Sequence, residues 1–136
     1  MELERTGKTL NKVADVFFNL LSSNTNEQMD KIAAEVSPKL SAHSDAISLN
    51  KKLFNRVNLV YEQRHELGLN TEQKRLVEET HKGFIRSGVQ LDTQSMEKLT
   101  QINQELSSLS VQFDQNLLKE TNEGYSLLID LSLIHI

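Results

Sequence analysis

Apolar residues recur along most of this chain at intervals of three and four positions, which is the period of an amphipathic α-helix. The first such stripe predicts a helix over Leu10–Leu21. The polar run 22–25 then predicts the end of this helix. Thr25 and Gln28 have the spacing of a capping box, in which the threonine hydroxyl and the glutamine side chain satisfy each other's backbone N–H groups. We therefore expect the second helix to begin at Thr25.

The second stripe runs from Met29 to Ile47 and contains the only proline of the chain. Proline inside a helix removes one backbone hydrogen bond and crowds the preceding turn. The sequence therefore predicts either a kink at Pro38 or a restart of the helix with Ser37 as its N-cap. His43 lies on the same apolar stripe, and a hydrogen-bonded core or boundary imidazole is the expected role there.

A third stripe predicts a helix over Leu53–Leu67, and Gly68 follows where a left-handed C-cap residue is expected. Asn70 and Gln73 have the spacing of a second helix N-terminus with a capping box. A fourth helix is therefore expected to begin directly after Asn70.

The fourth stripe covers Leu76–Ile85 and stops at Gly88, and the last stripe is the longest of the chain. Its seven apolar residues step by 3, 3, 4, 3, 4 and 4, close to the 3.5-residue period of two helices packed lengthwise: Met96, Leu99, Ile102, Leu106, Leu109, Phe113 and Leu117. This stripe fits a dimer seam, but a partner within the same chain is the favoured interpretation. Gly124 is expected to end the helix, and the β-prone run after it predicts a short strand near 125–130.

The composition agrees with an all-α fold. The 136 residues include only 5 Gly and 1 Pro, too few for the many turns of a β-sandwich, and no Cys, which excludes a disulfide framework and a thiol nucleophile. We expect an antiparallel bundle of about five helices with short loops. The formal charge of −4 offers no basic patch for nucleic acid or anionic lipid. No signal peptide or membrane span is recognisable, so the cytoplasm is the expected compartment.

The four histidines do not form a recognisable metal site. His65 and Glu66 resemble the start of an HExxH zinc motif, but position 69 is Leu, and no two histidines share a helical spacing. His81 follows two glutamates and is expected on a solvated polar face. The chain also lacks a glycine elbow around any serine and a glycine-rich phosphate loop. We therefore predict no catalytic, no cofactor-binding and no metal-binding residue in this chain.

Several segments nevertheless resemble one enzyme family, the thimet-oligopeptidase-type zinc metallopeptidases. The segments Val16–Asn26 and Leu53–Val57 are similar to early helices of that family, and Glu66–Glu78 matches its L-G-L-x-x-E-x-x-R-L-V pattern. The last predicted helix also resembles a helix of that family, and the matching residues are Leu99, Ile102, Asn103, Leu106, Leu109, Gln112, Phe113, Asn116, Leu117 and Leu118. The motifs are most similar to the bacterial peptidyl-dipeptidase branch, also called dipeptidyl carboxypeptidase, with the oligopeptidase A branch as a near relative.

The resemblance implies a concrete function for a longer protein. Members of the family are helical, cytoplasmic enzymes that cut short peptides in a channel between two lobes, and peptidyl-dipeptidases release dipeptides from free C-termini. The resemblance implies one zinc ion, held by residues beyond this chain. Residues 1–130 would form part of the N-terminal helical lobe, with the remaining catalytic lobe as partner. This chain is expected to be inactive alone.

The two ends depart from the family pattern. Family members have a segment before the first helix, so Met1 is interpreted as an internal start or a truncation. Residues 131–136 do not fit the family and are interpreted as foreign sequence, with a divergent strand as the alternative. The competing hypothesis for the whole chain is a stand-alone helical interaction module that grips a partner helix with an exposed stripe such as Met96 to Leu117.

Overall fold

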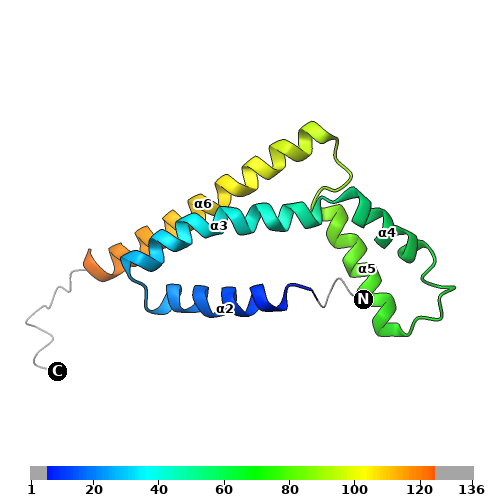
Figure 1. Cartoon of the computed structure of the whole chain (residues 1–136), viewed down its shortest axis with the longest axis horizontal. Helices are drawn as coiled ribbons and strands as arrows, with labels where there is room; N and C mark the ends of the chain where they lie inside the picture. The colour runs from blue at the N-terminus through cyan, green and yellow to red at the C-terminus, as the bar shows by residue number, and fades with distance from the viewer. Residues whose placement is uncertain (1–5, 125–136) are drawn as a thin grey trace, which may run out of the picture. The chain divides into compact units, whose positions relative to one another are not determined.

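A computed structural model of the chain describes residues 6–124, and every regular element within this range is a helix (Figure 1). The five helices in this range are α2 (Lys8–Ser23), α3 (Glu27–Ser48), α4 (Lys51–Glu62), α5 (Thr71–Arg86) and α6 (Thr93–Glu123). The predicted all-α class and the number of helices are confirmed for these residues. The strand predicted near 125–130 and the tail 131–136 lie outside the described residues.

The chain divides into two compact units, and α3 and α6 each contribute to both. One unit is continuous in sequence and spans Glu35–Ser108. The other combines the chain before residue 35 with the chain after residue 108. Two long helices therefore run through both units, whereas α4 and α5 belong to a single unit.

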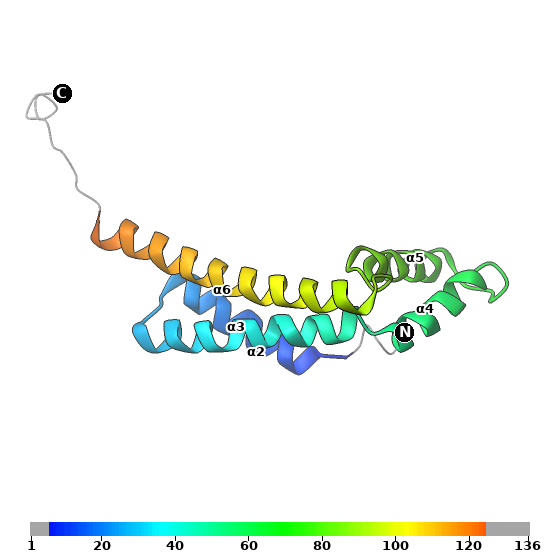
Figure 2. The same cartoon turned by 90° about the horizontal axis from the view of Figure 1, so that it is seen from above.

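The unit Glu35–Ser108 is built around the pair of helices α4 and α5, which lie side by side (Figure 2). Its most completely buried apolar side chains come from this pair and from the loop that follows it: Val57, Val77, Phe84 and Val89. The Lys51 side chain donates a 2.9 Å hydrogen bond to the backbone carbonyl of Leu91, which ties the start of α4 to the same loop. This small apolar cluster is the core of the unit.

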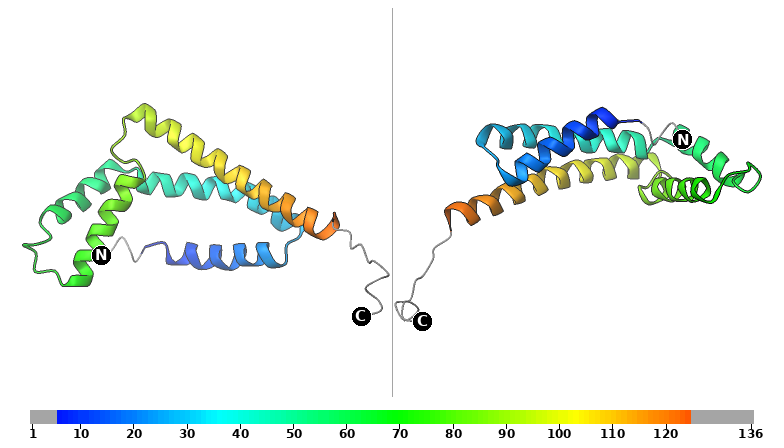
Figure 3. Two further views of the ribbon diagram at one scale, coloured as in Figure 1. Left: turned by 180° about the vertical axis from the view of Figure 1, so that it is seen from behind. Right: turned by 90° about the horizontal axis from the view of Figure 1, so that it is seen from below.

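The second unit contains α2, the first turns of α3 and the second half of α6. A short turn joins α2 to α3 (Figure 3). Ala33 is fully buried, while α2 buries none of its side chains completely. Phe17 and Phe18 pack edge to face with ring centroids 5.2 Å apart. The side-chain amide of Gln115 on α6 donates to the backbone carbonyl of Asp30 on α3 at 3.1 Å.

The start of the second helix differs from the prediction. Asn26, and not Thr25, caps α3, because its side-chain oxygen accepts 3.0 Å hydrogen bonds from the backbone N–H groups of Gln28 and Met29. The Thr25 hydroxyl instead donates to the carboxylate of Asp30 at 2.6 Å. The predicted cap was wrong by one residue, because asparagine and threonine stand next to each other and both can cap a helix. The third residue after Asn26 is Met29, so the reciprocal half of the predicted capping box is not formed.

Pro38 does not restart the second helix. It lies inside α3, which continues from Glu27 to Ser48. Ser37 is not an N-cap either: its hydroxyl oxygen is buried and has no hydrogen-bond partner. The residues before Pro38 on the same helix, Ala33 and Ser37, are both buried.

The third helix is shorter than predicted. It ends at Glu62, and residues 63–68 form turns that lead to Gly68, whose φ of 62° is left-handed as expected. The guanidinium of Arg64 donates a 2.6 Å hydrogen bond to the backbone carbonyl of Tyr61, which takes up one of the carbonyls that a longer helix would have used. The later predictions hold: Gly88 has a φ of 92° shortly after α5, and Gly124 follows α6.

The predicted capping box at the start of α5 is confirmed. The Asn70 side-chain oxygen accepts from the backbone N–H of Gln73 at 2.8 Å, and the Gln73 side chain accepts from the backbone N–H of Asn70 at 3.1 Å. Two N–H groups without helical partners are thereby satisfied.

We expect Asn70→Ala to lower the free energy of unfolding by about 1 kcal/mol, because the first turn of α5 loses its side-chain acceptor. Urea unfolding followed by circular dichroism measures this change. The control Asn70→Asp keeps an acceptor at the same place and should remain close to the wild type. An unchanged midpoint for Asn70→Ala would show that the cap contributes nothing to this fold.

Asp92 caps the N-terminus of α6. Its carboxylate accepts a 2.7 Å hydrogen bond from the Ser95 hydroxyl and a 3.0 Å hydrogen bond from the Ser95 backbone N–H. These bonds, the hydroxyl first, favour the ionised carboxylate and hold the pKa of Asp92 below its usual value. A lowered pKa means that the cap stabilises the folded state above the unfolded pKa of about 3.9, and that this contribution is lost as the pH falls through the folded value.

We therefore expect the difference in melting temperature between the wild type and Asp92→Asn to shrink as the pH falls from 6 towards 3. Asparagine still caps the helix but does not titrate, so other carboxyl groups contribute equally to both proteins and cancel. Thermal unfolding at a series of pH values measures the difference. A difference that stays constant, or that grows at low pH, would contradict the assigned role of Asp92.

Candidate functional site

The most prominent surface of the described chain is an apolar stripe along α6. Its five outward-facing side chains are between 49% and 67% exposed: Ile102, Leu106, Leu109, Phe113 and Leu117. Met96 and Leu99, at the start of the same stripe, are partly buried. The predicted heptad-like stripe is therefore present, but from Ile102 onward the described residues provide no partner that buries it. The expectation of a covering partner within these residues was wrong.

The opposite face of α6 is the one that packs. Val111 follows Ile102 by nine positions, which is two and a half turns at 3.6 residues per turn, and so lies on the opposite side of the helix. The partly buried residues on that side are mostly polar or small: Thr100, Asn103, Gln104, Ser107, Ser108, Val111, Gln115 and Leu118. Asn103 donates from its side-chain amide to both carboxylate oxygens of Asp45 on α3, at 3.0 and 3.1 Å.

A small polar residue is also buried on α3. Ser37 is only 8% exposed, and its hydroxyl is buried without a hydrogen-bond partner. An unsatisfied buried hydroxyl costs free energy, because it gives up its hydrogen bonds to water and receives none in return. The buried groups of α3 and α6 therefore include polar ones, whereas the large apolar side chains of α6 are exposed.

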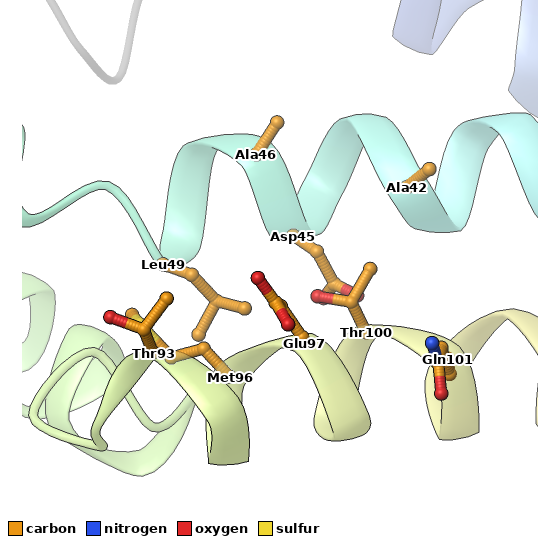
Figure 4. Close-up of a pocket in the computed structure, with 9 residues that line it drawn as sticks. All are labelled: Ala42, Asp45, Ala46, Leu49, Thr93, Met96, Glu97, Thr100 and Gln101. Carbon is orange, nitrogen blue, oxygen red and sulfur yellow. The ribbon is translucent and has the colours of Figure 1, made fainter.

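A groove in the unit Glu35–Ser108 separates the end of α3 from the start of α6 (Figure 4). Its volume is about 450 Å³, and it is open to solvent. Its lining residues are Ala42, Asp45, Ala46, Leu49, Thr93, Met96, Glu97, Thr100 and Gln101. Figure 4 shows the side chains of Asp45, Leu49 and Glu97 in the space between the two helices. The groove combines an apolar floor with two carboxylates, and its lining includes neither a histidine nor a lysine.

The α4–α5 pair contains a polar cluster that the sequence did not predict. The His81 ring stacks on Tyr61, with centroids 3.9 Å apart and planes within 2°, and faces Phe54 at 5.5 Å. The guanidinium of Arg64 lies 4.0 Å from the Tyr61 ring centroid, and its Nε is 3.4 Å from the Glu78 carboxylate. The expectation that His81 lies on a solvated polar face was wrong, because α4 covers this side of α5 with aromatic side chains.

Hydrogen bonding determines the orientation of this histidine. Asn58 donates from its amide nitrogen to the Glu62 carboxylate at 2.8 Å, so its oxygen faces His81 Nε2 at 2.9 Å. An amide oxygen is an acceptor, so Nε2 must carry the hydrogen. The imidazole is thus held by stacking and by one directed bond, which is typical of a structural histidine that joins two helices.

The other histidines are scattered. His43 is exposed, so its predicted place in the core or at its boundary was wrong: the packed face of α3 is rotated away from it. His65 is exposed in the turns after α4, and His135 lies outside the described residues. Within residues 6–124, no group of three or more His, Cys, Asp or Glu side chains is placed to hold a metal ion. No helix in that range is long and apolar enough to cross a membrane.

The geometry alone does not identify the relatives of this chain, but comparison with known proteins does. No family model matches the chain. The dipeptidyl carboxypeptidase of Salmonella typhimurium is 38% identical over 91% of the chain, and that of Escherichia coli is 34% identical over 97%. This chain is a homologue of the dipeptidyl carboxypeptidases. The thimet-like oligopeptidase of Dictyostelium discoideum is 33% identical over 72% of the chain.

The resemblance seen in the sequence motifs is thereby confirmed. The chain spans only 18–19% of the length of the two dipeptidyl carboxypeptidases, and 15% of the length of the oligopeptidase. The homologous part of these peptidases is therefore a small portion of each. In the present chain, all regular elements within residues 6–124 are helices.

The buried Ser37 hydroxyl gives a direct test of the packed α3 face. We expect Ser37→Ala to raise the free energy of unfolding by about 1 kcal/mol, because the substitution removes a polar atom that has no partner. Denaturant unfolding measures the gain. The control Ser110→Ala, at an exposed site on α6, accounts for the higher helix propensity of alanine. If Ser37→Ala were destabilising, the hydroxyl would have to be hydrogen-bonded in solution.

Proposed function

We propose that this chain is a non-catalytic, N-terminal helical part of a longer zinc metallopeptidase. The full-length protein hydrolyses short peptides and releases dipeptides from their C-termini. The observation that carries the proposal is the identity of 34–38% with two dipeptidyl carboxypeptidases over nearly the whole chain, although the chain spans less than a fifth of each. Residues 1–130 form the proposed lobe part, in the cytoplasm.

The uncovered face of α6 supports this role. Burying a Leu, Ile or Phe side chain that was exposed is worth about 1.5–3 kcal/mol, so covering five half-exposed ones contributes on the order of 5–10 kcal/mol. That is comparable to the stability of a whole domain. In the longer protein, the remaining catalytic lobe of the same polypeptide is proposed to cover this face of α6. The present chain would then form one wall of the channel.

The residues of this chain do not fit the zinc that the family implies. His65 and Glu66 lie in exposed turns, and Leu69 stands where a second histidine of an HExxH motif would be needed. The zinc ligands and the groups that activate water are therefore proposed to lie in the rest of the longer protein. The contribution of this chain is structural: it forms a wall beside the peptide-binding channel.

One observation also favours the competing role of a stand-alone interaction module. The exposed heptad-like stripe of α6 is the kind of surface that grips a partner helix. The two roles differ in what precedes and follows these residues in the natural protein. A reading frame that continues beyond Asp130 into an HExxH motif would support the peptidase role.

We expect the purified chain to cleave no peptide, whether or not zinc is added, since it lacks metal ligands and a nucleophile in any recognised arrangement. The longer natural protein should release C-terminal dipeptides from a synthetic peptide and lose this activity to a chelator such as 1,10-phenanthroline. Mass spectrometry of the products measures both results.

The matched control is the longer protein with the glutamate of its HExxH motif changed to glutamine, which should be folded and inactive. Zinc-dependent cleavage by the present chain would overturn the assignment of catalysis to the remainder. A longer protein that is folded, binds zinc and cleaves no peptide would overturn the proposed peptidase function.

A further inference from the structure

The exposed apolar face of α6 can also be buried by a second copy of the same chain. The stripe from Ile102 to Leu117 extends for about 22 Å at a rise of 1.5 Å per residue. We infer that a second copy of this chain covers it, so that the two α6 helices pack lengthwise in a homodimer. This inference goes beyond the proposed function, because it describes what the chain does in the absence of a longer polypeptide.

The spacing of the stripe specifies the kind of partner. Residues 99, 102, 106, 109 and 113 alternate in steps of three and four, which is the pattern that keeps one seam facing a second helix over several turns. A helix that crossed α6 steeply would cover only part of this length. The partner must therefore be a helix that carries a similar seam, and α6 of a second copy is such a helix.

Charge at the edge of the stripe does not oppose this pairing. Lys98 and Glu105 flank the seam on one side and contribute one charge of each sign. Ser110 flanks it on the other side. Two stripes can therefore pair without a row of like charges repelling each other, although each chain carries a formal charge of −4.

The area available matches a weak but specific dimer. Each of the five side chains is half to two-thirds exposed, and a Leu, Ile or Phe side chain has on the order of 100 Å² to bury. Pairing two stripes thus removes on the order of 1,000 Å² from water, which is the lower limit for a specific interface. Interfaces near this limit are typical of weak, transient complexes, so dissociation in the micromolar range or above is expected.

The α2 helix offers the main competing contact, because it also exposes apolar residues: Leu10, Val13, Val16 and Leu20. A contact between α2 of one copy and α6 of another can be reciprocal, so it can also stop at two chains. Mass alone therefore does not distinguish it from a dimer through α6. A cross-link between residue 106 of both copies does, because only α6–α6 pairing brings these two positions together.

Sedimentation velocity of the whole chain, from about 1 to about 200 μM, tests the inference across the expected dissociation constant. The mass should rise from that of one 15.5 kDa chain to twice that value and stop there. Leu106→Glu places a charge in the middle of the seam and should weaken dimerisation at least about 30-fold. The control Gln101→Glu adds the same charge to an exposed position outside the seam and should change it less than about 3-fold.

A second measurement does not depend on a disruptive substitution. The chain contains no cysteine, so a single Leu106→Cys provides a unique site for a short bis-maleimide cross-linker. We expect efficient capture of a covalent dimer, whereas Glu66→Cys, exposed in the turns after α4, should give little. Helicity by circular dichroism should be the same for all variants.

The inference is overturned if the wild type stays monomeric throughout, if it grows beyond two chains, or if both charge variants weaken association equally. These outcomes leave the peptide-cleavage assay unaffected. Conversely, a longer protein without peptidase activity would overturn the proposed function and would not alter the mass of this chain in solution.

Discussion

The packing of this protein depends on helix α6, which has a polar face towards α3 and an apolar face that is exposed. Its inward side carries short polar residues, among them Asn103, whose amide binds both carboxylate oxygens of Asp45. Short polar side chains bury little apolar area. Hydrogen bonds to a carboxylate contribute about 1.5–3 kcal/mol in net stability. The large apolar side chains of α6 lie on the other side, so most of the hydrophobic free energy of this helix remains available for a further partner.

The α4–α5 pair has the opposite arrangement, because its most buried side chains are apolar. Its most buried apolar side chains are Val57, Val77 and Phe84. The Phe54 ring on α4 lies 6.0 Å from the Phe84 ring on α5. Its polar groups are paired within the hairpin: His81 binds Asn58, and Arg64 contacts both Tyr61 and Glu78. This pair therefore keeps most of its buried apolar side chains within one unit, although Leu59 and Ile85 remain exposed. On α6 the large apolar side chains are the exposed ones.

The comparisons with dipeptidyl carboxypeptidases agree with this contrast. Large exposed apolar surfaces mark interaction sites, and α6 carries such a surface in a chain that spans less than a fifth of its relatives' length. Under the proposed function, the remaining lobe covers the stripe. In the chain alone, the same stripe is offered to a second copy. One apolar face therefore accounts for both proposals, and they remain experimentally separate because one concerns cleavage and the other mass.

Local sequence was a reliable guide wherever a structural feature depends on neighbours along the chain. The number of helices, the capping box at Asn70 and Gln73, and the glycines that follow α5 and α6 were all predictable, because caps and helix periods involve residues three or four positions apart. The sequence by itself also identified the peptidase relatives. It misplaced His43 and His81, and it expected the stripe of α6 to be covered. Periodicity shows that a helix has an apolar face, but only the tertiary structure decides which face meets a neighbour, because that depends on residues far away in the chain.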